Sequence, residues 1–273
     1  MQSPPQLTDR IALSRNRDRA QAMASPAMFL QQDAALEVQE RLALVNRTFK
    51  SPAIVTPFAD IWCDVIPGAH IVADNDTLQL DEGAHDLVIH AMSLHWASDP
   101  VGQLVQSRRA LCPDGFFLGS LFGGQTLTEL RAVLAEAEVA ISGGLSPRVA
   151  PMAEIRDLGA LLQRAGFALP VADSFKRTVT YQSALHLMRD LRAMGEANAL
   201  IGRNRTPLRR AVLTDAITRY DVAFRQGGRI PATFEMIFLT GWSPHASQPQ
   251  PLRPGSATTR LADALGTDEN PIS

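Results

Sequence analysis

His95 is the side chain best suited to chemistry, because it follows a short apolar run, residues 87–89, at the point where a strand would end. A neutral imidazole at that position could act as a general base or orient a substrate. Alternatively, His95 and the adjacent Trp96 could close a loop by packing and one hydrogen bond. Both interpretations stay open on the sequence, and in the first of them Trp96 is expected to contact the substrate.

A second candidate segment, residues 123–126, follows another apolar run at 116–121. Its two glycines permit a tight turn into a helix whose free N–H groups would receive a carboxylate or phosphate. Gln125 would then contact the substrate. Without a ligand, the segment would be a plain turn with Thr126 as the helix cap. Glu129 is a candidate general base, although an acid in the first turn of a helix also favours the helix dipole.

Arg148 lies in the sequence GGLSPR, a glycine- and proline-containing loop between two predicted helices. An arginine on such a loop is a candidate substrate-binding clamp for an anionic group. No metal is predicted. The histidines that invite a metal alternate poorly on their strands and lack a carboxylate at a fixed spacing. They are His70, His85, His90 and His95.

The elements that must position these residues alternate between strand and helix. Asp86 enters the first apolar run, residues 101–111 have helical spacing, and Pro-Asp-Gly stops that helix before the run at 116–121. Strand, helix and strand in this order form a right-handed βαβ unit of a parallel sheet. Ligands of such sheets bind beyond the carboxyl ends of the strands. We therefore expect a pocket lined by Ala91, Ser93, His95 and Gly123.

The turn after the first predicted strand, residues 53–57, contains no glycine before Gly68. In folds that bind dinucleotides or S-adenosylmethionine (SAM), a glycine-rich turn lets the backbone approach the ligand. Pro57 offers no N–H and Phe58 is bulky, so we predict that these two residues occupy the cofactor's space. The interval up to Asp86 is too short for the two crossovers of a full nucleotide-binding half.

The rest of the chain is predicted to be helical units around this sheet. Residues 1–50 would form N-terminal helices, the first capped by Asp9 and carrying a basic stripe that is either a solvated face or grips a substrate. Residues 51–242 would form the α/β domain, with a helical insertion at about 184–225 that caps the carboxyl edge. Residues 243–273 would be a loop-rich tail.

Composition excludes several classes of protein. The 273 residues are 45% hydrophobic and 20% charged with a net charge of −2, as in a soluble globular protein. We therefore expect neither a nucleic acid partner nor stable membrane insertion. Two cysteines, Cys63 and Cys112, suit a reducing cytoplasm, where we predict the protein to be located. The oligomeric state is not indicated.

Several motifs resemble those that follow the glycine loop in type-11 class I SAM-dependent methyltransferases. They are Asp74, DLV at 86–88, SLHW at 93–96 and CPDGFFL at 112–118. Further motifs resemble the branch that holds the malonyl-carrier-protein methyltransferase of biotin synthesis and, more closely, the respiratory complex I assembly factor. These are FGGQTLTELR at 122–131, GGLSPR at 143–148, RDLGALLQRAGF at 156–167, LMRDLRAMGEAN at 187–198 and TGWSPHASQ at 240–248.

The resemblance implies an α/β, Rossmann-like class I methyltransferase fold with a shortened N-terminal half of the sheet, N-terminal helices and a helical cap. It also implies SAM as the cofactor. Asp74 with Asn75 would lie by the adenine, and the turn containing His90, Ala91 and Ser93 would pass the methionine end. In an alternative register, Asp74 would instead bind the ribose.

Two functions are consistent with these residues. The first is a SAM-dependent enzyme that transfers a methyl group to a protein substrate, with a complex I subunit as the implied substrate; the resemblance also implies arginine hydroxylation. For methyl transfer, His95 or Glu129 would accept a proton. The second is a binding protein or assembly chaperone that has lost the cofactor. The missing glycines favour the second function, whereas Asp74 and the SLHW stretch favour the first.

Overall fold

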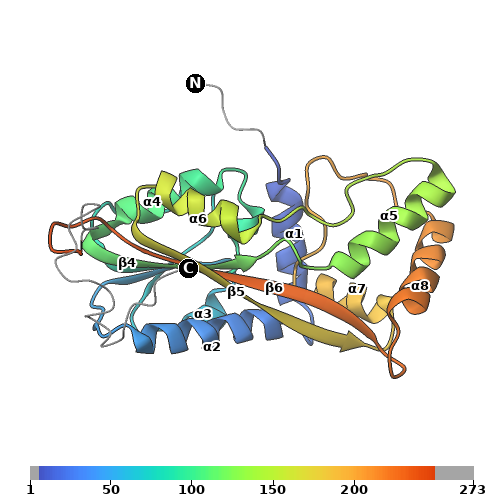
Figure 1. The fold of residues 1–273 in the computed structure, drawn as a ribbon, viewed down its shortest axis with the longest axis horizontal. Helices are drawn as coiled ribbons and strands as arrows, with labels where there is room; N and C mark the ends of the chain where they lie inside the picture. The colour runs from blue at the N-terminus through green and yellow to red at the C-terminus, as the bar shows by residue number, and fades with distance from the viewer. Residues whose placement is uncertain (1–5, 250–273) are drawn as a thin grey trace, which may run out of the picture.

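A computed structural model describes residues 6–249, which form an open sheet covered by helices on both faces (Figure 1). The described residues contain six strands in the order β2-β1-β3-β4-β6-β5. The pairs among β1, β2, β3 and β4 are parallel, whereas β6 is antiparallel to both of its neighbours. The strands are β1 Pro52–Val55, β2 His70–Val72, β3 His85–His90, β4 Leu111–Phe122, β5 Ala168–Tyr181 and β6 Ile230–Trp242.

The helices divide between the two faces of this sheet. In Figure 1, α2 and α3 cover one face and α4 and α6 cover the other, while α5, α7 and α8 pack on the long antiparallel pair of β5 and β6. The helices are α1 Arg10–Gln21, α2 Phe29–Leu44, α3 Ala59–Trp62, α4 Pro100–Ala110, α5 Thr128–Ser142, α6 Ile155–Arg164, α7 Ala184–Ala193 and α8 Arg210–Phe224, with a 3₁₀ turn, η1, at Leu94–Trp96.

The strand order is the doubly wound, Rossmann-like arrangement predicted from the sequence. The chain runs from β1 outward to β2 and then returns to β3 on the other side of β1. The sheet therefore has its topological switch point between β1 and β3, where ligands of such folds bind. Only β1 and β2 precede β3, with the short α3 between them, so this half of the sheet is reduced as expected.

Several boundaries differ from the predicted ones. The strand β4 begins at Leu111 rather than 116, because the predicted turn Pro-Asp-Gly is itself part of a long, bent strand with Asp114 at a positive φ of 61°. The final strand extends from Ile230 to Trp242, because it pairs with β5 along that strand's length.

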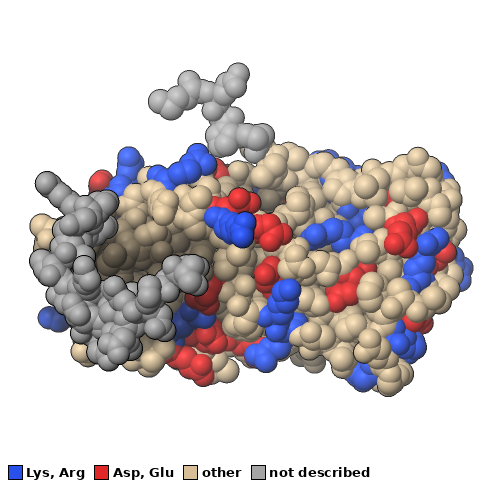
Figure 2. Space-filling view, in the orientation of Figure 1, with Lys and Arg blue, Asp and Glu red and all other residues tan. Residues whose placement is uncertain are grey.

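The core consists of two apolar layers, one on each face of the sheet. The larger layer joins α2, α5, α7 and α8 to the sheet and includes Trp62 and Phe238, both with 0% exposure. The smaller layer packs α4 and α6 against the other face. Charged residues of both signs are interspersed on the molecular face in Figure 2, in keeping with the net charge of −2. Within residues 6–249, no helix has both the length and the apolar character that crossing a bilayer requires.

Asp86 has a structural role that its place in the DLV motif did not reveal. Its carboxylate accepts hydrogen bonds from the backbone N–H groups of Lys50 (2.6 Å) and Ser51 (3.0 Å). The acid at the start of β3 thereby holds the segment that enters β1 next to it. This explains, without any ligand, why an acid precedes the apolar run.

We expect Asp86→Ala to lower the free energy of unfolding by about 1 to 2 kcal/mol, because two backbone donors lose a charged acceptor. The measurement is equilibrium denaturation in urea. Asp81→Ala is the matched control, since Asp81 is exposed, and it should change stability by less than about 0.5 kcal/mol. Equal stability of the two variants would contradict this role for Asp86.

Candidate functional site

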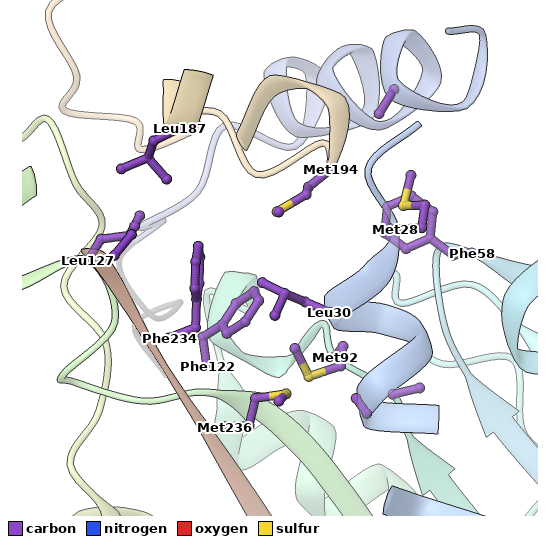
Figure 3. Packing of buried hydrophobic residues seen from close by; sticks show 14 of the residues in the cluster. Met28, Leu30, Phe58, Met92, Phe122, Leu127, Leu187, Met194, Phe234 and Met236 are labelled. Atoms are coloured by element: carbon purple, nitrogen blue, oxygen red, sulfur yellow. The ribbon is translucent and has the colours of Figure 1, made fainter. Parts of the chain in front are cut away.

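The crevice at the switch point is filled by side chains of the chain itself. Phe58, in the turn after β1, is 1% exposed and belongs to the larger core layer with Met28 and Met92. Figure 3 shows Met28 beside Phe58. Gly195, after α7, also approaches closely, because a Cβ there would lie 3.5 Å from Phe58 Cζ. Phe58 is therefore part of the core, whereas Pro57 is only half-buried, and the occupation of cofactor space by these two residues stays a prediction.

Asp74, the acid expected beside the adenine, is held by arginines of α1. Arg17 Nη1 lies 2.9 Å and 3.0 Å from the two carboxylate oxygens, and Arg10 Nη2 donates to the Asp74 carbonyl at 2.6 Å. Asp74 is 3% exposed, so its carboxylate is not available to a ligand. Asn75 has an exposed position and accepts from Gln103 through its backbone carbonyl.

The turn expected to pass the methionine end of SAM is also buried. His90 is 0% exposed, its Nε2 lies 2.8 Å from Gln103 Oε1, and its Nδ1 lies 3.5 Å from Ser93 Oγ. Burial lowers the pKa of His90 and outweighs the opposing effects of Gln103 and Asp74. Ala91 is likewise completely buried and is tied to β1 by a backbone hydrogen bond.

His95 and Trp96 share one acceptor, Glu196, in the segment after α7. Trp96 Nε1 donates to Glu196 Oε2 at 2.7 Å, and His95 Nε2 lies 3.3 Å from the same oxygen. The backbone N–H of Phe122 points to His95 Nδ1 at 3.5 Å, so both ring nitrogens have partners. Burial raises the pKa of Glu196, but His95, Arg17 and Trp96 together hold that pKa below its ordinary value.

Glu196 is a site residue that the sequence did not reveal. The Glu196 side chain is only 8% exposed, although Arg192 in the preceding helix is exposed. The signal that could have found it is the glycine at 195, since Gly195 has a positive φ of 81° and turns the chain inward at that point.

The turn at residues 123–126 carries an internal carboxylate where an anionic ligand was expected. Gln125 N donates to Glu235 Oε2 at 2.9 Å, and a Cβ on Gly123 would lie only 2.5 Å from that oxygen. The predicted helix cap at Thr126 is wrong. Leu127, in the left-handed conformation, occupies the cap position, and the Thr126 hydroxyl instead exchanges hydrogen bonds with the backbone of Glu235.

Glu129 and Arg148 are both paired within the chain. The Glu129 carboxylate accepts from the Thr233 hydroxyl at 2.5 Å and the Thr233 backbone N–H at 3.2 Å, which anchors α5 to β6. Arg148 Nη2 lies 2.6 Å from Glu138 Oε1. Burial raises the pKa of Glu138, but Arg148 and Ser146 outweigh it and lower the pKa to about 2.

A cavity of about 1310 Å³ lies beside this site, between α1, the start of α5, the end of α7 and the segment 196–208. The predicted lining is wrong, because Ala91, Ser93, His95 and Gly123 are absent from its wall. Trp96 and Phe122 line it instead, with Arg148. The physical reason is that Ala91, Ser93 and Gly123 are buried, and the cavity opens in front of the loops after β2, β3 and β4, where Asp76, Ser98 and Phe122 line it. No group of histidine, cysteine and acidic residues that could hold a metal occurs among the described residues.

Comparison with known proteins reveals similarity over most of the chain. It is 39% identical over 198 residues to the mitochondrial arginine-hydroxylase NDUFAF5 of Danio rerio, covering 72% of this chain and 62% of that protein. For the Homo sapiens protein of that name, the values are 38% over 205 residues, 75% and 59%. The malonyl-[acyl-carrier protein] O-methyltransferase of Laribacter hongkongensis is 35% identical over 178 residues, covering 65% and 58%. The chain is similar to both groups over these residues.

The similarity covers only part of these relatives: the chain spans between 58% and 62% of their length. No family model matches the sequence. Among solved structures, a SAM-dependent methyltransferase of Thermotoga maritima has a TM-score of 0.44 and 13% identity, covering 85% of this chain and 99% of that chain.

Because the lowered pKa of Glu138 stabilises the folded state above the unfolded pKa of about 4.5, we expect Glu138→Gln to be less stable at pH 7 by about 2 to 3 kcal/mol. The difference from the parent should shrink as the pH falls from that value toward about 2. Thermal unfolding across this range is the measurement. Glu136→Gln, whose side chain is 62% exposed, should change stability by less than about 0.5 kcal/mol. A pH-independent difference would refute the assignment.

Proposed function

We propose that the protein acts in the assembly of respiratory complex I as a methyltransferase-like protein that binds a protein partner and holds no SAM at the switch point. Homology to NDUFAF5, named an arginine-hydroxylase, and to malonyl-[acyl-carrier protein] O-methyltransferases supports this setting. The single observation that carries the cofactor-free part is the Arg17–Asp74 ion pair, which takes the acid that the resemblance assigned to adenine.

The residues present at the switch point do not fit SAM. A cofactor would need Asp74 and the space after β1, and these are taken by Arg17 and by the buried ring of Phe58. His90, Ala91 and Ser93 are enclosed as well. A closely packed interior does not admit a group of this size without moving α1.

The second candidate function is SAM-dependent modification of a protein side chain. The observation that favours it is the cavity next to the SLHW segment, which Trp96 lines and which could admit a side chain of a partner. In that reaction His95 or Glu129 would accept a proton, so both would have to leave their present hydrogen-bond partners. The cytoplasmic location stays a prediction. The names of the NDUFAF5 relatives, in contrast, include the word mitochondrial.

Calorimetric titration with SAM and with its demethylated product distinguishes these functions. We expect no binding at micromolar concentrations, because Asp74 is buried against Arg17 and the buried ring of Phe58 follows β1. The Laribacter hongkongensis methyltransferase, measured in the same way, provides the positive control. Micromolar binding of SAM to this chain, with binding lost on Asn75→Ala, would reject the proposal and favour the SAM-dependent enzyme.

Replacing Asp74 is not the harmless change that a vacant site would allow. Because Asp74 is buried against Arg17, we expect Asp74→Ala to destabilise the fold by about 3 to 5 kcal/mol. Its effect on assembly would therefore reflect folding. Variants that separate partner binding from folding must change exposed residues.

Arg192 and Arg189 provide such a pair on α7. Both are exposed, and Arg192 lines the cavity whereas Arg189 does not. In cells from which the gene has been deleted, we expect Arg192→Ala to restore less assembled complex I than Arg189→Ala, which should match the parent. Native gel analysis with equal protein levels is the measurement. Equal restoration by both variants would contradict a binding role for this wall of the cavity.

A further inference from the structure

The cavity beside α1 has a strongly basic wall in a protein of slightly negative net charge. Seven arginines and three carboxylates line it, without a lysine. The arginines are Arg10, Arg15, Arg19, Arg148, Arg192, Arg203 and Arg205, and the acids are Asp9, Asp76 and Glu196. Because charges on the face in Figure 2 are mixed, this excess of one sign is a local property of the cavity.

Two of the three acids already have partners within the chain. Asp9 pairs with Arg203 at 2.9 Å, and Glu196 accepts from Trp96 Nε1 at 2.7 Å and lies 3.3 Å from His95 Nε2. Within residues 6–249, no carboxylate lies within 4.0 Å of a guanidinium nitrogen of Arg15, Arg19 or Arg192; the ion pairs of that region involve other arginines. The cavity therefore presents more free guanidinium groups than free carboxylates.

Arg15 and Arg19 are one helical turn apart on α1 and face the same space. Their separation along the helix axis is about 6 Å. Like charges at this spacing destabilise a helix, so an anion between them would relieve a repulsion that is present without it. In an extended peptide, side chains two residues apart are separated by about 6.6 to 6.8 Å, which nearly matches this spacing.

Apolar side chains also line the cavity. Phe122 and Phe234 lie side by side with ring centroids 6.1 Å apart (Figure 3), and at 3% and 1% exposure they form a buried backing to this wall. The other apolar residues of the wall include Trp96, Leu127, Leu130, Met152, Met188 and Leu191. A suitable ligand therefore has carboxylates next to apolar groups.

The size and construction of the cavity favour a chain segment over a small anion. Its volume of about 1310 Å³ exceeds the roughly 300 to 1,000 Å³ of small-molecule sites. The free arginines come from two separate elements, α1 and α7, which both line the space. A peptide with several acids offers a carboxylate to each guanidinium, which a single carboxylate does not.

We propose that this cavity binds an extended acidic segment of a partner protein, with its carboxylates on Arg15, Arg19 and Arg192 and its apolar side chains against the apolar residues of the wall. The inference deepens the proposed function, on which it rests for a protein as the partner. It also sets a restriction. A segment that presents arginine would meet like charges, so the cavity is not suited to receive the substrate that the name arginine-hydroxylase implies for the relatives.

The test uses the full chain and three labelled synthetic peptides in fluorescence anisotropy. The first peptide carries glutamates two residues apart among leucine and phenylalanine, the second has glutamine in place of every glutamate, and the third has arginine there. We expect the glutamate peptide to bind about tenfold or more tightly than the glutamine peptide, since each guanidinium–carboxylate bond is a charged hydrogen bond. The arginine peptide should not bind.

A double variant, Arg15→Gln with Arg19→Gln, locates the binding. It should weaken the glutamate peptide about tenfold or more and leave the glutamine peptide unchanged. The control is Arg156→Gln with Arg164→Gln, which removes the same charge from two exposed arginines of α6 outside the cavity. This control should bind as the parent does. Thermal unfolding of each variant verifies that it is folded.

Equal binding of the glutamate and glutamine peptides would overturn the inference, as would equal losses in the two double variants or tighter binding of the arginine peptide. These outcomes are separate from the test of the proposed function. SAM binding would reject the cofactor-free proposal without affecting the peptide result. If the glutamate peptide did not bind, the acidic segment would be rejected as the ligand. The proposed function would still stand, with a protein partner of different chemistry.

Discussion

The ion pair between Arg17 and Asp74 is the interaction on which the site depends. It joins the N-terminal helix α1 to the end of β2 and lies almost completely inside the protein, with side-chain exposures of 8% and 4%. Breaking a buried pair leaves one charge without its partner and costs more than an exposed pair. Because α1 is fixed at this point, one wall of the large cavity and the closure of the switch-point crevice are fixed with it.

The pair is not complete in its hydrogen bonding. Arg17 Nε and Nη2 have no partner, although Glu196 adds a favourable charge from the segment after α7. A buried guanidinium with two unused donors is energetically poor. Arg17 is therefore better explained as a residue that specifies where α1 lies than as a source of net stability.

Internal carboxylates repeatedly take positions where ligands were expected. Glu235 accepts from the turn after β4, Glu196 accepts from Trp96, and Glu138 holds Arg148. Each removes a donor that a bound anion or substrate would otherwise use. The exception is the basic wall formed by Arg15, Arg19 and Arg192, and this is why the site's remaining binding capacity lies in the large cavity beside α1.

The sequence alone determined the sheet, its switch point and the loops at its carboxyl edge, because alternating apolar runs and helical spacing are local properties of the chain. It also determined that Phe58 stands where a glycine turn is usual. Only the tertiary structure decided what those loops contact. Arg17 and Asp74 are 57 residues apart, and Trp96 and Glu196 are 100 apart. No local pattern encodes such pairs, so residues that looked available for ligands, Asp74, His95, Glu129 and Arg148, are in fact bound to partners brought together by folding.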